Sequence, residues 1–314
     1  MAAGNLVEEI SDNLKLVVDA VKRAGPMAWA LIGLMIVLYI NPAQWIWRAW
    51  FREDGYYTHG PLIPLVAGWM VLTNKDRLAR LPIKPNWFGL VIIVLCSLGF
   101  LASTLCHMNP PKYFIFVFYI LGLMLLLFGT KITKALLLPW AFLFFMVPLP
   151  DAVIDIFTYQ LRIFVTAAAV HLVDPLGWAI VKSGNYIYYP SGETLVVDDV
   201  CAGLRSLISL LALGAIFAYL SKLNPTGKLI LFILSAPVAI VTNIIRIFSL
   251  VVVAKFWGTK VASGTVHDFS GYAIFVVAFG LLYALNAILE RFFPDNDDAE
   301  PTAVKSEPQQ EGAG

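Results

Sequence analysis

The sequence has few charged residues. Only 14% of its 314 residues are Asp, Glu, Lys or Arg, the formal net charge is +1, and no block of Lys and Arg forms a basic stripe. Nucleic-acid-binding proteins need such a stripe for the phosphate backbone. The composition therefore argues against nucleic acid as a partner, and the near-neutral charge gives no sign of an acidic partner.

Cysteine is also scarce. The three cysteines, Cys96, Cys106 and Cys201, form no CxxC motif and show no Cys/His spacing typical of zinc. Because an odd number cannot all pair within one chain, at least one thiol is expected to be free. The sequence predicts no metal site and no cofactor.

Hydrophobic residues, in contrast, make up 59% of the chain and occur in long runs. A helix that crosses a bilayer needs about 20 apolar residues. Seven runs approach that length and an eighth is shorter, which predicts an all-α polytopic membrane protein with about eight transmembrane helices. The expected spans are residues 27–47, 60–73, 87–105, 113–129, 135–147, 202–220, 229–252 and 269–289.

The charges between these runs indicate the orientation, because cytoplasmic loops retain Lys and Arg. One set of alternate loops contains thirteen: Lys15, Lys22, Arg23, Lys75, Arg77, Arg80, Lys84, Lys131, Lys134, Lys222, Lys228, Arg291 and Lys305. The other set contains six: Arg48, Arg52, Lys112, Lys182, Lys255 and Lys260. We therefore expect both termini in the cytoplasm.

The remaining segments complete the expected organisation. Residues 155–178 mix polar and apolar residues, so we expect an interfacial or re-entrant segment on the outer side. Turn, β-branched and aromatic residues in 184–197 predict a short β-hairpin after it. We expect three parts: a cytoplasmic N-terminal segment (1–25), a single membrane domain (26–293) and a disordered acidic cytoplasmic tail (294–314).

Ionisable residues in membrane helices are costly and therefore mark functional sites. Cys201 opens the sixth expected span, and His267 opens the last one. Arg246 lies in the seventh span, after Lys228, and at ~1.5 Å per residue it returns to the outer boundary. The three side chains are therefore predicted to share one layer at the outer face.

This set can perform nucleophilic chemistry. A helix N-terminus and nearby cations such as Arg205 lower the pKa of a thiol like Cys201, although Asp198 and Asp199 oppose thiolate formation unless they cap the helix or pair with arginines. A histidine can take the thiol proton and return it to a leaving amine. A guanidinium can stabilise the oxyanion.

Each residue also has a structural interpretation. Cys201 could be a small packing residue, Arg246 could extend to the headgroups, and His267 could be a helix-cap neighbour or a proton-relay group. Their convergence at one depth favours catalysis. His59, also expected on the outer side, is a second candidate base or an interfacial loop contact.

Several motifs resemble the exosortase/archaeosortase family of membrane transpeptidases. They are CAGLRSL at 201–207, NIIR at 243–246, VHDFSG at 266–271, YYTHGPLIPL at 56–65 and the approach to the cysteine at 184–200. The cysteine motif is the most specific of these. Their order and placement on successive spans argue against coincidence, and the one departure, Ala202 where serine is common, implies no loss of activity.

The resemblance implies a catalytic site in which Cys201 is the nucleophile, His267 is the base and acid, and Arg246 stabilises the oxyanion. It also suggests supporting residues, which are Arg205, Ser206, Asn243, Asp199 and His59.

The resemblance further implies a thiol protease and transpeptidase in the bacterial inner membrane, with its active site facing the periplasm. Its partners would be secreted proteins with a C-terminal tripartite sorting tail: a PEP-CTERM-like motif, a membrane helix and a basic end. The enzyme would cut beside the motif and transfer the acyl group to an acceptor, in bacteria that make exopolysaccharide.

Two other functions remain compatible with the residues. A non-catalytic transporter or polysaccharide-export assembly factor would use Arg246 and His267 in a pathway, although no internal repeat typical of transporters is evident. A membrane acyltransferase or hydrolase would use the Cys/His pair on lipid-linked acyl groups. Tailed substrates encoded in the same genome would favour the exosortase-like function.

Overall fold

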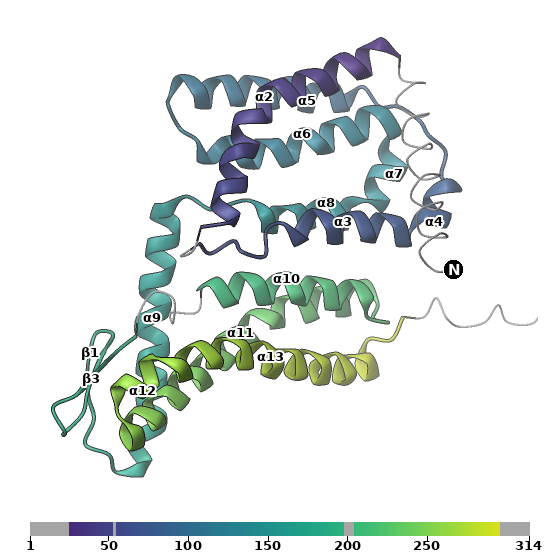
Figure 1. The fold of residues 1–314 in the computed structure, drawn as a ribbon. Helices are drawn as coiled ribbons and strands as arrows, with labels where there is room; N and C mark the ends of the chain where they lie inside the picture. The colour runs from purple at the N-terminus through teal and green to yellow at the C-terminus, as the bar shows by residue number, and fades with distance from the viewer. Residues whose placement is uncertain (1–24, 53–54, 198–203, 296–314) are drawn as a thin grey trace, which may run out of the picture.

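The computed structural model describes residues 25–52, 55–197 and 204–295, which are almost entirely helical (Figure 1). The N-terminal half contains α2 (Pro26–Trp50), α3 (Leu62–Thr73), α4 (Lys75–Ala79), α5 (Phe88–Leu105), α6 (Pro110–Phe128), α7 (Thr130–Ala135), α8 (Leu137–Phe142) and the 3₁₀ turn η1 (Leu143–Met146).

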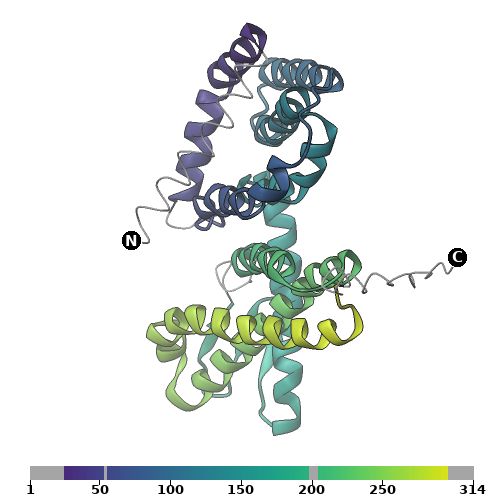
Figure 2. The same ribbon diagram turned by 90° about the vertical axis from the view of Figure 1, so that its right-hand side faces the viewer.

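The C-terminal half follows a connecting helix, α9 (Asp151–Val173), and the turn η2 (Asp174–Leu176). It contains β1 (Val181–Ser183), β2 (Tyr186–Tyr188), β3 (Thr194–Val196), α10 (Leu204–Leu220), α11 (Pro225–Trp257), α12 (Thr259–Ser263) and α13 (Thr265–Phe292). Figure 2 shows the two halves one above the other, joined by α9.

The polytopic all-α prediction is confirmed. Within the described ranges, six helices are long and apolar enough to cross a membrane, and three shorter apolar helices cover 62–73, 137–146 and 204–220. Five of the six long helices and these three short ones correspond to the eight expected spans. The helix in the expected span at 135–147 is shorter than predicted. It starts after a bend at Leu136 and gives way to a 3₁₀ turn at Leu143.

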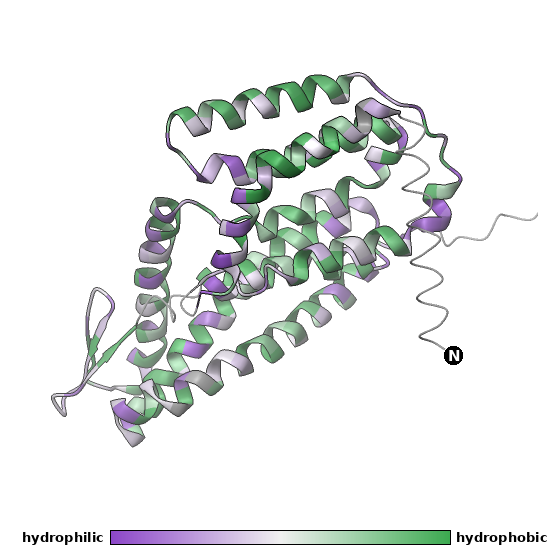
Figure 3. Ribbon diagram, turned by 45° about the horizontal axis from the view of Figure 1, so that its top comes forward, coloured by the Kyte–Doolittle hydropathy of each residue, from purple (hydrophilic) through white to green (hydrophobic). Residues whose placement is uncertain are grey.

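The remaining long helix is α9, whose composition and direction point to different positions in the membrane. Residues Asp151–Leu176 are long and apolar enough to cross a membrane, although the polar residues of 155–178 suggested a segment that does not cross. In Figures 1 and 2, α9 runs crosswise to α10 and α13. Polar residues recur along its length, whereas α5 and α6 are almost continuously apolar (Figure 3). This direction supports the interfacial position, which stays a prediction.

Two residue types explain the bends of the N-terminal half. Pro42 lies inside α2 and removes a helical N–H, and the helix turns near its middle (Figure 1). Gly129 ends α6 with a φ of 81°, and a Cβ there would lie 1.7 Å from the carbonyl oxygen of Lys84. A glycine is therefore required where the chain after α4 passes α6.

The predicted hairpin is confirmed and has one additional strand. The sheet is antiparallel in the order β1-β2-β3, with Val181 opposite Tyr188 and Tyr186 opposite Val196. Alternate residues point to opposite faces, so Ile187 and Leu195 are buried. They join a core cluster with residues of α9 and α11, which fixes the sheet beside these helices.

Most loops of the expected charged set lie together in the structure. In Figure 1, α4, α7 and the end of α13 lie at one end of the molecule, while the sheet and α12 lie at the other. The backbone N–H of Asp295 donates to the carbonyl of Lys222, 3.1 Å away, which adds the α10–α11 turn to the first end. The side of the membrane that each end faces stays a prediction.

Candidate active site

The centre of the site is Arg246 on α11. Its side chain is only 9% exposed, although a buried guanidinium is costly unless polar groups surround it. Nε donates to Oγ of Ser270 at 3.0 Å, and Nη2 donates to the carbonyl of His267 at 3.2 Å. Both partners belong to the first turns of α13, so Arg246 connects the two helices.

The same guanidinium lies against the ring of His267. Nη2 of Arg246 and Nε2 of His267 are 3.3 Å apart. Because arginine has donors and no acceptor, Nε2 is the acceptor in this contact, and the proton of a neutral ring is then assigned to Nδ1. The ring nitrogen that faces the guanidinium is thus a hydrogen-bond acceptor.

Ser270 completes this cluster and was missed in the sequence. Its Oγ donates to the carbonyl of His267 at 2.7 Å while it accepts from Arg246. One hydroxyl therefore ties the histidine backbone to the guanidinium. The spacing of three residues places Ser270 and His267 on one helix face, but this spacing alone does not mark a site.

The sheet positions the chain that leads to the predicted nucleophile. Val197, just beyond β3, lines a cavity of about 60 Å³ together with His267 and Ile247. The next residues, 198–203, lie outside the described part of the chain, and so do the predicted nucleophile Cys201 and the supporting Asp199. The described part of the chain continues from Leu204, the first residue of α10.

Three further predicted residues lie on α10 and α11. Asn243 is one turn before Arg246 on α11 and is 1% exposed. Ser206 is buried at the start of α10, and Arg205 beside it is half-buried. Nε of Arg205 makes no hydrogen bond within the part of the chain that the structure describes.

His59 contacts α10. It lies in the turn before α3, where its Nδ1 is 3.1 Å from Oγ of Ser209. Burial lowers the pKa of His59, and a backbone hydrogen bond involving Phe145 offsets part of this change. Ser209 was also missed, although it follows Arg205 by four residues, the spacing of one helical turn.

Two polar contacts fix the sheet to the end of α11. Oη of Tyr189 donates to the carbonyl of Val251 at 3.1 Å. The carboxylate of Glu193 accepts from the backbone N–H of Thr259 at 2.9 Å and so caps the start of α12. The strand that leads to Val197 is thereby held against the helix that carries Arg246.

Within the described ranges, no group of three or more His, Cys, Asp or Glu residues is placed to hold a metal ion. The described polar groups of the site are a cation, an imidazole and a hydroxyl. These groups can bind an anion and move a proton.

The fold and this polar cluster define a multi-pass membrane protein with a buried arginine, Arg246, in contact with a half-buried histidine, His267, near one end of its helices. The model of the transmembrane exosortase family matches residues 45–284, so the chain belongs to that family. The match includes Arg246, His267 and the predicted Cys201. No match is found among the curated proteins or among the solved structures.

Proposed function

We propose that this chain is a membrane cysteine protease and transpeptidase that cleaves PEP-CTERM-like sorting tails of exported proteins. It would act at the periplasmic face of the bacterial inner membrane and transfer the acyl product to an acceptor, in support of exopolysaccharide-linked surface sorting. The observation that carries the proposal is the buried contact of Arg246 with His267 and Ser270, together with the family's match.

In the proposed first step, Cys201 loses its proton to Nε2 of His267 and its thiolate attacks the scissile carbonyl. The contact between Arg246 and Nε2 is 3.3 Å, longer than a strong charge-assisted hydrogen bond. The guanidinium is planar and moves as one unit, so a small shift of the whole group would release Nε2 and bring an N–H toward the oxyanion. The bond from Nε to Ser270 limits the size of this shift.

In the second step the tetrahedral adduct collapses. The C–N bond of the tail breaks, and His267 gives its proton to the leaving amine. The other product is a thioester on Cys201, which an acceptor nucleophile resolves by transfer or water resolves by hydrolysis. Arg246 and His267 therefore act in both halves of the cycle.

The direct test is co-expression with a candidate tailed protein, followed by mass analysis of the new C-terminus. The expected product ends beside the recognition motif and carries an acceptor, or a free carboxylate if water competes. Several tailed candidates should be tried. If none of them is cleaved in cells that contain the wild-type enzyme, the result would contradict the proposal and favour a transporter or assembly factor.

A further inference from the structure

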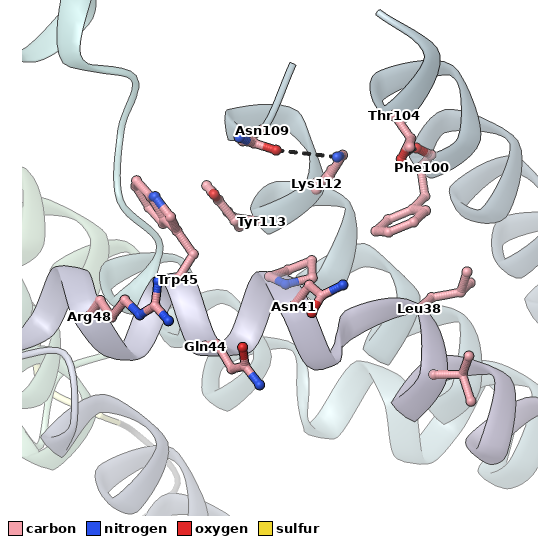
Figure 4. Close-up of a pocket in the computed structure, with 12 residues that line it drawn as sticks. Leu38, Asn41, Gln44, Trp45, Arg48, Phe100, Thr104, Asn109, Lys112 and Tyr113 are labelled. Carbon is pink, nitrogen blue, oxygen red and sulfur yellow. Dashed lines mark hydrogen bonds between the residues drawn. The ribbon is translucent and has the colours of Figure 1, made fainter. Parts of the chain in front are cut away.

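A second polar cavity lies away from this site. It has a volume of about 480 Å³ and lies between α2 and the hairpin of α5 and α6 (Figure 4). We propose that this cavity binds the phosphate headgroup of an anionic phospholipid, with the acyl chains along its apolar side. The inference is independent of the proposed catalytic reaction.

The charge of the cavity favours an anion. Its lining residues include two cations, Arg48 and Lys112, and no carboxylate. The Lys112 ammonium is held by Oδ1 of Asn109 at 3.2 Å and lies 5.6 Å from the ring centroid of Phe100. Basic pockets between membrane helices are typical headgroup sites, and a fixed ammonium loses less side-chain entropy on binding.

Other polar and aromatic groups add to the same region. Asn41 of α2 faces Lys112 and Tyr113 across the cavity (Figure 4). The rings of Trp45 and Tyr113 stack at 4.5 Å with an interplanar angle of 9° and form one wall. Trp and Tyr are enriched at the level of lipid headgroups, so the wall has the composition expected at that depth.

The lining changes from apolar to polar along α2, as an amphiphile requires. Val37 and Leu38 form its apolar part, and Arg48 lies eleven residues beyond Val37, at most about 16 Å along α2, which bends at Pro42 between them. Only 17% of the membrane-span window of α2 is buried in the protein. Lipid can therefore reach the cavity along the apolar part of this helix.

A free phosphate would satisfy the cations equally well but has no group that contacts the apolar side. Val37 is 72% exposed next to the cavity and belongs to a helix apolar enough to span a membrane, so acyl chains lie against it and can position their own headgroup at the cavity. This contribution favours the lipid over the free anion.

The test measures lipid binding to the full chain purified in mild detergent, by native mass spectrometry with phosphatidylglycerol, phosphatidylcholine and glycerol phosphate as separate probes. Wild-type protein should retain phosphatidylglycerol in preference to the other two. The double variant R48Q/K112Q should bind phosphatidylglycerol on the order of tenfold or more less tightly, because two charge-assisted contacts are lost.

The matched control is K255Q/K260Q, which removes the same charge from two exposed lysines of α11 and α12. It should bind the lipid as wild type does. Asn41→Trp fills the cavity but keeps both charges, and this variant should also lose the lipid. It tests the proposal independently if R48Q/K112Q fails to fold. Equal losses in the control, full binding by Asn41→Trp, or glycerol phosphate bound as tightly as the lipid would each overturn the proposal.

Discussion

The two halves of the molecule use polar atoms differently. In the N-terminal half, buried Tyr39 packs against the rings of Phe100, Phe116 and Tyr119. The indole N–H of Trp50 donates to the carbonyl of Met146 at 3.0 Å. Such contacts stabilise packing between uncharged side chains.

The C-terminal half buries a permanent charge. Arg246 is enclosed by polar partners from α13, and the tyrosine and glutamate of the sheet add hydrogen bonds at the end of α11. An ionised group of this kind costs stability unless it is well paired. From this comparison we propose that the N-terminal half is a packing frame and the C-terminal half holds the reactive groups, and substitutions can test this division.

The largest effect is expected at the predicted nucleophile. Cys201→Ala and Cys201→Ser should both abolish processing of a tailed substrate, since a serine hydroxyl is far harder to ionise than a thiol beside the same base. Membrane insertion should be unchanged. The measurement is the fraction of substrate cleaved in cells without a second enzyme of this type.

The control for that experiment is Cys106→Ser, at the exposed cysteine of the α5–α6 turn. It should process substrate as wild type does. Normal processing by Cys201→Ala would show that the nucleophile lies elsewhere.

The next effect concerns Arg246. Arg246→Lys keeps the charge but loses the planar fork that reaches Ser270 and His267 together. We expect a loss of order 10²-fold in processing rate, as for removal of one oxyanion donor, and a comparable or larger loss for His267→Ala. Arg291→Lys, at the exposed end of α13, is the matched control; a similar loss there would indicate a folding defect instead.

A smaller effect is expected at His59, the residue of the N-terminal half that contacts α10 at Ser209. His59→Gln should lower processing by only a few-fold, on the order of one lost hydrogen bond, and Ser209→Ala should match it. If His59→Gln were as severe as His267→Ala, the general base would have to be reassigned and the division between the halves would fail.

The stability of the protein should also depend on pH through His59. Its folded-state pKa is lowered by burial, so the folded chain binds this proton less readily than the unfolded chain, whose pKa is ~6.5. Stability is therefore greatest above that value and falls as the pH drops below it. Thermal unfolding in detergent from pH 7.5 to 5 should show a smaller decrease for His59→Gln than for wild type; identical decreases would refute the assignment.

The smallest effect is expected from removal of residues 296–314. This segment is acidic and lacks apolar runs, so it can contribute little oriented binding energy to a substrate. Processing by the truncated protein should remain within about two-fold of wild type. A large loss would assign a functional role to a part of the chain outside both halves.

Much of the fold was predictable because lipid imposes a simple rule on composition. The apolar runs identified the helices, and helical rise alone indicated that Arg246 and His267 lie at one depth. Their direct contact could not be predicted, since rotation about the helix axes depends on packing between distant segments. The role of Cys201 stays a prediction.

Other features depended on three-dimensional context. The polar residues of α9 indicated an amphipathic segment, but its crosswise direction follows from packing against the sheet and α11. Ser270 was missed because one serine in a helix carries no distinct pattern until its partner, Arg246, is placed. The contact between His59 and Ser209 joins positions 150 residues apart, which spacing alone cannot predict.

The length of α11 has a consequence for where a substrate would be cut. The helix has 33 residues and so extends about 50 Å, whereas the hydrocarbon layer is ~30 Å thick. Arg246 lies 21 residues after Pro225, at most about 32 Å from that end, which matches the far boundary of the layer. Under the proposed function, the height of Arg246 above the lipid would select the peptide bond to be cut, and a sorting tail would have to present its recognition motif directly where its own membrane helix emerges.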